Sequence, residues 1–281
     1  MRGEDSVKSG TAFSRPSLPE SRIQNPESRL RVVITGASSG IGMALARHYL
    51  GHGAIVAAIA RRKELLQALN AEFPDSVHCY ALDIRDAVAL RQAADDFIAR
   101  IGVPNVVIAN AGVSVGTLTE YPEDIEAYQQ VMDVNVLGIV KTFQPFIAAM
   151  RTHQNGTLVG IASVAGFRGL PGAGAYSASK AAAIAYLESL RVELHGSGVK
   201  VVTVCPGYIR TAMTEINPYP MPFMLEADEA ARRIARTIAR QKSFAVIPWQ
   251  MGVVGWLLKR LPRWLYDRLF ANAPHKPRGL L

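Results

Sequence analysis

The sequence predicts one α/β domain of the Rossmann type, a doubly wound parallel sheet of seven strands with helices on both faces. Three observations predict it: seven short apolar or β-branched runs, longer segments of helical spacing between them, and a glycine-rich turn directly after the first run. Because the runs lack polar alternation, we expect strands buried on both faces, as in sheets built from right-handed βαβ units. The runs are Val32–Thr35, Ala54–Ala60, Val77–Leu82, Val106–Ala109, Thr157–Ile161, Val199–Val204 and Phe244–Ile247.

Length and composition fit a single folded domain with extensions. The chain has 281 residues, of which 49% are hydrophobic and 19% charged, as is ordinary for a globular protein. We expect a domain over residues 31–248, a polar extension over residues 1–30 and an amphipathic C-terminal tail over residues 249–281. The extension lacks the apolar stretch of a secretory signal, and its composition predicts disorder. The sequence contains no run of 18 apolar residues, so we expect no membrane span.

The distribution of charge argues against a nucleic-acid interface. The formal net charge is +8, and the tail alone carries a net +5. Residues 1–31 carry a net +2, which leaves the domain between them almost neutral. A basic tail on a neutral domain is not the footprint of nucleic-acid binding. Cys79 and Cys205 both lie in apolar runs, so we expect two buried, reduced thiols.

The first run leads into a glycine-rich turn, T-G-A-S-S-G-I-G at residues 35–42, ahead of the helical segment Met43–Leu50. Glycines between a strand and a helix allow the backbone to approach a pyrophosphate, whose charge the helix N-terminus favours. The spacing is G-x-x-x-G-x-G rather than the common G-x-G-x-x-G. The turn therefore predicts a dinucleotide site formed by Gly36, Ser38, Ser39, Gly40, Ile41 and Gly42.

The end of the second run bears on the choice between NAD(H) and NADP(H). NAD sites place an acidic residue there for the ribose 2′-hydroxyl, whereas an arginine accommodates a 2′-phosphate. Here the run ends in Arg61-Arg62-Lys63, with no carboxylate before Glu64. Cations are disfavoured at a helix N-terminus, so three in succession indicate an anionic partner. We therefore expect Arg61 and Arg62 to bind NADP(H) in preference to NAD(H), the alternative being a solvated helix start.

Two further segments follow strands on the side where open sheets bind ligands. Asp83 and Ile84 follow the third run, and Asn110, Ala111 and Gly112 follow the fourth. We expect these residues to join the cofactor site.

A candidate proton-transfer pair opens the long apolar helix that continues to Leu194. Tyr176 and Lys180 are four positions apart, so the phenol and the ammonium project from the same helix face. A neighbouring cation favours phenolate, which predicts a lowered pKa for Tyr176 and makes it a candidate general acid/base. Ser163, just past the fifth run, can bring its hydroxyl to the same substrate oxygen.

Together these motifs resemble the single-domain branch of the short-chain dehydrogenase/reductase family over about residues 30–248. One departure is Ala109, where many relatives have an asparagine. The segments that carry the resemblance are T-G-x-x-x-G-x-G at 35–42, Asp83, N-A-G at 110–112, Asn135, Ser163, Y-x-x-x-K at 176–180 and Pro206-Gly207 through Thr211.

The resemblance implies a role for each matching residue. Tyr176 exchanges a proton with the substrate oxygen, and Ser163 orients that oxygen. Lys180 lowers the Tyr176 pKa and binds the nicotinamide ribose, while Asn135 holds a water that links Lys180 to solvent. Asp83 contacts adenine. The segment that cradles the nicotinamide carboxamide comprises Pro206, Gly207, Ile209 and Thr211.

The implied activity is the NADP(H)-dependent interconversion of an alcohol and a ketone or aldehyde by a cytoplasmic homodimer or homotetramer, with no metal. Met and aromatic residues in the lid-like segment 212–225 favour a lipophilic substrate, although they can equally pack on the core. An alternative is a non-catalytic NADP-binding sensor or scaffold with the same fold. The intact set Asn135, Ser163, Tyr176 and Lys180 argues against it.

The tail allows two interpretations. Charged residues gather on one helical face of Val254–Phe270 and apolar residues cover much of the rest, while Pro262 is expected to break the helix into two pieces. A basic amphipathic helix with tryptophan can lie on an anionic membrane surface. It can also pack on its own domain or on a second subunit, which we favour because most amphipathic helices bury their apolar stripe within the protein.

Overall fold

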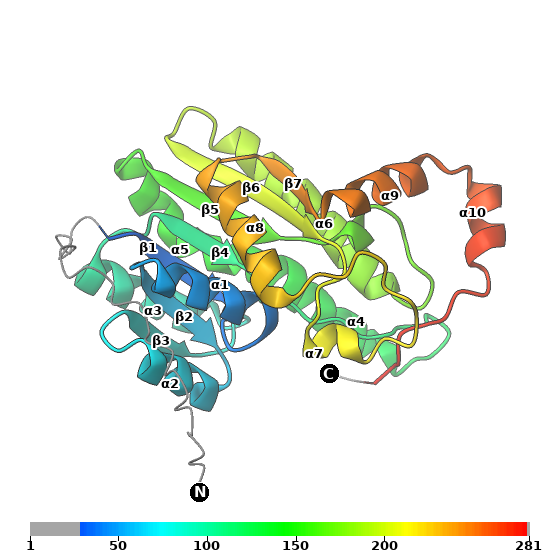
Figure 1. Ribbon diagram of the computed structural model, residues 1–281, viewed down its shortest axis with the longest axis horizontal. Coiled ribbons are helices and arrows are strands. Elements are labelled where there is room, and N and C mark those ends of the chain that lie inside the picture. The colour runs from blue at the N-terminus through cyan, green and yellow to red at the C-terminus, as the bar shows by residue number, and fades with distance from the viewer. Residues whose placement is uncertain (1–28, 280–281) are drawn as a thin grey trace, which may run out of the picture.

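A computed structural model describes residues 29–279 and shows a seven-stranded sheet in the order β3-β2-β1-β4-β5-β6-β7 (Figure 1). Every neighbouring pair of strands is parallel. The predicted fold is confirmed, and each predicted run matches a strand to within two residues at either end. Of the predicted extension, residues 1–28 lie outside the described residues. The strands are β1 Arg31–Thr35, β2 Ile55–Ala60, β3 Val77–Ala81, β4 Val106–Ala109, β5 Gly156–Ile161, β6 Val199–Pro206 and β7 Phe244–Ile247.

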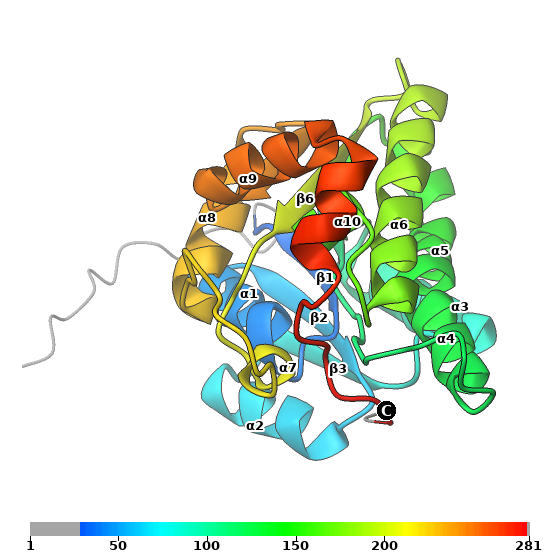
Figure 2. The ribbon, with the colours of Figure 1, turned by 90° about the vertical axis from the view of Figure 1, so that its right-hand side faces the viewer.

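Helices cover both faces of the sheet and enclose two separate apolar layers. Helices α1, α2 and α8 bury side chains on one face, and α3, α5 and α6 bury theirs on the other. Figures 1 and 2 show the sheet between these groups. The helices are α1 Gly40–Gly51, α2 Lys63–Glu72, α3 Ala87–Ile101, α4 Asp124–Met132, α5 Gly138–Thr152, α6 Gly174–Glu193, α7 Ala212–Glu215, α8 Ala227–Ala239, α9 Trp249–Arg260 and α10 Arg263–Phe270.

The strand order fixes where a ligand can bind. From β1 the chain moves outward to β2 and β3, then crosses back so that β4 pairs with the other side of β1. The loops that follow β1 and β4 therefore leave the sheet in opposite directions and open a crevice between them at the carboxyl ends of the strands. The glycine-rich turn and the Asn110 loop both lie at this edge.

One continuous helical stretch, Asp124–Thr152, is long and apolar enough by length and composition to cross a membrane. It joins α4 and α5 through a π-helical turn, Asp133–Leu137. The side chains of Phe143, Phe146 and Met150 are fully buried in the layer beneath α5. The stretch is therefore a core helix of this domain, as apolar helices beneath a sheet commonly are.

The two cysteines differ, and the prediction that both are buried is wrong for Cys79. Cys205 is fully buried in β6, whereas Cys79 is exposed on β3, and both thiols are free. The reason is the sheet order, because β3 is an edge strand in which only Val77 is buried. The Cys79 thiol donates a hydrogen bond to the Leu66 carbonyl at 3.2 Å.

The tail packs on its own domain, as favoured above, and breaks at Pro262 as predicted. The Arg168 guanidinium donates to the carbonyl oxygens of Leu258 and Leu261, both at 2.9 Å. The Tyr266 hydroxyl donates to the Gly169 carbonyl at 2.5 Å. Only part of the apolar stripe is covered, however. Three apolar residues that we expected to be buried are largely exposed, namely Trp256, Leu257 and Leu269.

Candidate active site

The glycine-rich turn is shaped so that only glycine fits at two of its positions. Gly36 has φ +69°, and a Cβ there would lie 2.8 Å from the Ala111 Cα. A Cβ on Gly42 would overlap the carbonyl oxygen of Gly36 and the side-chain amide of Asn110. The turn is therefore pressed against the β4 loop, and the start of α1 is free to face a bound anion.

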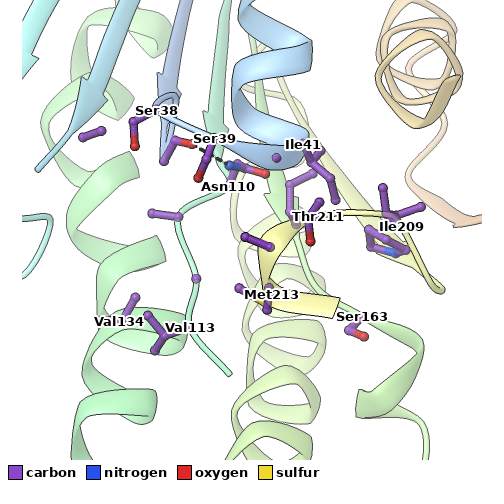
Figure 3. Close-up of a pocket in the computed structure, with 18 of the residues that line it drawn as sticks. Ser38, Ser39, Ile41, Asn110, Val113, Val134, Ser163, Ile209, Thr211 and Met213 are labelled. Atoms are coloured by element: carbon purple, nitrogen blue, oxygen red, sulfur yellow. Dashed lines mark hydrogen bonds between the residues drawn. The ribbon is translucent and has the colours of Figure 1, made fainter. Parts of the chain in front are cut away.

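Side chains from β1 and the β4 loop hold this turn in place. The Asn110 side-chain amide donates to the Thr35 carbonyl oxygen at 3.0 Å (Figure 3 shows Asn110 beside the turn). The Thr35 hydroxyl oxygen accepts from the backbone N–H of Asn110 at 3.1 Å and of Ala111 at 3.3 Å. The sequence reasoning placed Asn110 in the site but missed Thr35 as a site residue. Its position at the end of the first buried run, ahead of Gly36, was the available signal.

The close fit at Gly42 predicts a large effect from one methyl group. Gly42→Ala should lower the free energy of unfolding by ~1–3 kcal/mol, the usual range for overpacking, and weaken dinucleotide binding because the turn must shift. Gly51→Ala is the matched control at the other end of α1, where a Cβ meets no atom within 4 Å. That variant should be neutral or gain up to ~1 kcal/mol. Chemical denaturation of both measures the difference, and equal stabilities would contradict the packing argument.

Arginine side chains make one end of the site positive. The Arg62 guanidinium donates to the Ser38 hydroxyl at 3.0 Å and to the Ser39 hydroxyl at 2.7 Å, so it is held over the glycine-rich turn. Arg61 lies next to it, and both line the cavity. Asp83 is the only carboxylate among the described residues that line it, and it forms an ion pair with Arg85 at 2.8 Å. That ion pair lowers the pKa of Asp83 and keeps it ionised.

The candidate catalytic side chains converge at the ends of β5 and β6. Lys180 is buried, and its ammonium donates to the Ile161 carbonyl oxygen at 2.9 Å. Its Nζ lies 5.7 Å from the centre of the Tyr176 ring. Ser163 is buried just past β5, where its hydroxyl oxygen accepts from the Ala165 N–H at 3.1 Å. Tyr176, Lys180 and Ser163 all line the same cavity as the glycine-rich turn.

The predicted lowering of the Tyr176 pKa is not found in this structure. Burial raises the pKa of the phenol, and the Ser163 hydroxyl opposes that rise only in part. Burial also lowers the pKa of Lys180 to about 8, although the neighbouring Cys205 opposes this change. The physical reason is desolvation, since removing water from an ionisable group disfavours its charged form. The phenol is therefore protonated at neutral pH.

Asn135 lies behind the cavity wall and joins three elements. It is fully buried in the π-helical turn before α5. Its amide nitrogen donates to the Val113 carbonyl at 2.9 Å and to the Ser179 hydroxyl at 3.0 Å, and its oxygen accepts from the Val113 N–H at 2.9 Å. Both N–H donors are thus used within the protein. Asn135 fixes the β4 loop against α6 next to Lys180, and its link to a water remains a prediction.

One cavity of about 410 Å³ contains nearly all of the predicted residues (Figure 3). That volume is within the range typical of small-molecule sites. Gly42 and Asn135 are the exceptions, because both pack behind its surface. The predicted residues that line the cavity are Gly36, Ser38, Ser39, Gly40, Ile41, Arg61, Arg62, Asp83, Ile84, Asn110, Ala111, Gly112, Ser163, Tyr176, Lys180, Pro206, Gly207, Ile209 and Thr211. Lining residues that the prediction missed are Ala60, Leu82, Val113, Val134, Ile161, Ala162, Ala212, Met213 and Thr214.

The last described residues form a C-terminal segment, 271–279, that follows α10 (Figure 2). Buried Lys276 donates to the Ser114 hydroxyl and to the Met213 carbonyl oxygen, both at 3.1 Å. Arg278 forms ion pairs with Asp124 at 2.8 Å and with Glu123 at 3.0 Å. The segment therefore ties α7, which carries Met213, to the β4 loop and to α4. No sequence pattern pointed to this contact.

Within residues 29–279, no three His, Cys, Asp or Glu side chains are grouped as a metal site requires. The chemistry that the arrangement itself offers is hydrogen bonding and proton transfer beside a cradle for a dinucleotide. A parallel open sheet with a glycine-rich turn, an arginine end and a buried tyrosine–lysine–serine group defines a dinucleotide-dependent oxidoreductase of the Rossmann class.

Known proteins bear this out. The model of the short chain dehydrogenase family matches residues 31–218. An uncharacterized oxidoreductase of Myxococcus xanthus is 38% identical over 238 residues, covering 84% of this chain and 94% of that protein. 11-beta-hydroxysteroid dehydrogenase A of Sesamum indicum is 31% identical over 270 residues, covering 88% and 77%. A short chain dehydrogenase of Burkholderia cenocepacia, solved in complex with NADP, superposes with a TM-score of 0.75 at 27% identity, covering 88% and 99%.

The chain therefore belongs to the short-chain dehydrogenase/reductase family, and the resemblance inferred from its motifs is confirmed. Membership places the protein among the oxidoreductases.

Proposed function

We propose that the protein is an NADP(H)-dependent oxidoreductase that interconverts an alcohol and a ketone or aldehyde. The observation that carries the proposal is the convergence of Tyr176, Ser163 and Lys180 in the cavity that also contains the glycine-rich turn. A proton donor and a hydride cofactor are the two things that carbonyl reduction needs, and here their sites adjoin.

The residues present fit a dinucleotide. The backbone of the turn can approach a pyrophosphate because side chains are excluded at Gly36 and Gly42. Ser38, Ser39 and Arg62 would hold the phosphate end, and Lys180 and the residues after β6 would hold the nicotinamide end. When bound, the cofactor supplies the hydride.

The rest of the mechanism belongs to the chain. The Ser163 hydroxyl donates a hydrogen bond to the carbonyl oxygen of the substrate and orients it. The Tyr176 phenol donates a proton to the same oxygen during reduction and takes it back during oxidation. Burial raises the pKa of Tyr176, so the phenol carries its proton at neutral pH and favours the reductive direction there. The Lys180 ammonium, directed to the Ile161 carbonyl, stabilises the phenolate that remains.

The preference for NADP(H) over NAD(H) rests on the charge at the end of β2. Arg61 and Arg62 line the cavity where an NAD site would carry a carboxylate, and Arg62 is already oriented by Ser38 and Ser39. A fixed guanidinium gives a 2′-phosphate a charge-assisted hydrogen bond. The Burkholderia relative, which was solved with NADP, is consistent with this choice.

A lipophilic substrate is favoured by apolar residues in the cavity wall. Val113, Val134 and Met213 line the same cavity as Tyr176, and the loop after α7 presents the exposed apolar residues Ile216 and Phe223. The relative from Sesamum indicum is named for a steroid substrate, which is of the same chemical class. Assembly into a homodimer or homotetramer and a cytoplasmic location stay predictions.

The test is a screen of NADPH oxidation by the purified protein against apolar ketones, aldehydes, keto-acyl thioesters and steroids. We expect turnover with at least one apolar carbonyl compound and little with small polar ones. Tight NADPH binding with no turnover on any class would favour the non-catalytic sensor instead. Absence of NADPH binding would contradict both.

A further inference from the structure

The tail helices leave an apolar face uncovered. On α9 the side chains of Trp249, Val253, Trp256 and Leu257 are 68%, 48%, 53% and 54% exposed. They are spaced i, i+4, i+7 and i+8, so they form one stripe along one side of the helix. Trp264, near the start of α10, is 67% exposed. We call these five residues the tryptophan face.

The opposite side of the two helices is already used for packing. Met251, Gly255 and Tyr266 are buried, and the Phe167 ring fills the space beside Gly255. The Arg168 and Tyr266 hydrogen bonds described above fix both helices to the domain. The tail therefore cannot turn its tryptophan face inward without breaking these contacts. Exposure of so many large apolar side chains together marks an interaction surface.

The basic residues around the tryptophan face indicate which kind of partner it binds. Lys259, Arg260, Arg263 and Arg268 lie on the same two helices, with Asp267 as their only acidic residue. The Arg260 guanidinium stacks on the Trp256 ring at 3.9 Å. Tryptophan beside arginine and lysine is the composition of surfaces that lie at a lipid interface, where the ring enters the headgroup region and the cations meet anionic lipid.

From this we infer that the tryptophan face and its basic residues form a binding surface for an anionic lipid bilayer, on which the enzyme rests without being inserted. A second copy of the chain is a poorer occupant. A two-fold contact through this face would bring four basic residues of one copy against the same four of the other. A bilayer instead supplies the opposite charge, and each basic residue near such a surface raises binding about fivefold.

The position of the surface suits a lipophilic substrate, although the inference does not depend on the proposed activity. Figure 2 shows α9, α10 and α7 on the same side of the molecule. Helix α7 carries Met213, which lines the cavity. Docking through the tail would thus turn the substrate side of the enzyme toward the lipid.

The chain provides its own probe. Its three tryptophans are Trp249, Trp256 and Trp264, so its tryptophan fluorescence comes only from the tryptophan face. We expect full-length protein to show a blue shift with vesicles of phosphatidylcholine and phosphatidylglycerol, and to be quenched by lipids brominated on the acyl chain. The shift should shrink with salt because the attraction is screened over about 8 Å at physiological ionic strength. Vesicles of phosphatidylcholine alone should bind at least tenfold more weakly.

Variants separate the two contributions. Lys259→Gln, Arg260→Gln and Arg263→Gln combined should lower binding to the anionic vesicles by at least tenfold. The matched control, Arg151→Gln, Arg191→Gln and Lys200→Gln, removes the same charge from other exposed positions and should change it by no more than about threefold. For the apolar part, Trp249→Ser with Val253→Ser should reduce flotation with vesicles, whereas Val88→Ser with Val192→Ser, equally exposed elsewhere, should not.

Three outcomes would overturn the inference. One is the absence of vesicle binding by the full-length protein at low salt. Another is equal binding to neutral and anionic vesicles. The third is a lipid-free blue shift that grows with protein concentration and a dimer lost in the Trp249→Ser, Val253→Ser variant, since that would show a second copy on this face. Deleting the whole tail is a poorer test, because Lys276 holds Met213, which lines the cavity, and Arg278 forms an ion pair with Asp124 of α4.

Discussion

Replacing Tyr176 by phenylalanine is expected to lower kcat by about 10²–10⁴-fold, the usual contribution of a positioned general acid. The phenol acts on the substrate oxygen, so the Kd for NADPH should change by less than about threefold. The substitution removes one oxygen atom from a residue whose ring stays packed beside Lys180. Single-turnover oxidation of NADPH with a true substrate measures the loss, and fluorescence titration measures the cofactor affinity.

A matched control lies on the same helix. Tyr186 is also partly buried on α6, yet it does not line the cavity. Tyr186→Phe should therefore leave kcat within about twofold of the unmodified enzyme. Near-normal turnover by the Tyr176 variant would show that the proton comes from another group. Lys180→Met should weaken both turnover and NADPH binding, because its ammonium is assigned to both tasks.

Removing both arginines at the end of β2 is expected to abolish the preference for NADPH. The unmodified protein should bind NADPH at least about tenfold more tightly than NADH, since one charge-assisted phosphate contact contributes roughly 1.5–3 kcal/mol. In the Arg61→Ala, Arg62→Ala variant the two affinities should converge, mainly through weaker NADPH binding. Of the single variants, Arg62→Ala should have the larger effect, because Ser38 and Ser39 orient that guanidinium over the turn.

Lys63 provides the comparison for this experiment. It is exposed one residue further along, at the start of α2, but it does not line the cavity. Lys63→Ala should leave the ratio of the two affinities within about twofold, which separates a specific contact from a general loss of positive charge. Calorimetric titration with each cofactor gives the ratio directly. Equal affinity of the unmodified protein for NADPH and NADH would refute the assignment.

Local pattern determined much of the fold and the site. Each of the seven runs matches a strand to within two residues at either end, because parallel strands buried on both faces are largely apolar. The residues that follow those strands meet at one edge, because all carboxyl ends of a parallel sheet point the same way. Tyr176 and Lys180 share a helix face through spacing alone. These features depend on periodicity and connectivity, which a sequence contains.

Other features depend on which elements become neighbours, and only the tertiary structure decided them. Cys79 is exposed because β3 lies at the edge of the sheet, and strand order is not encoded in the run itself. The Tyr176 pKa is raised rather than lowered because burial desolvates the phenol, and this effect outweighs the hydrogen bond from Ser163.

The longest-range contacts were the least predictable. Lys276 joins Ser114 across 162 positions of sequence, and Arg168 holds the tail through carbonyl oxygens that any residue type would offer. The amphipathic pattern of the tail foretold a packed side and a break at Pro262. It did not show that the domain covers only part of the apolar stripe and leaves three tryptophans exposed at the surface. Hydrophobic periodicity records which residues are apolar, whereas the area available to cover them is set by the shape of the folded domain.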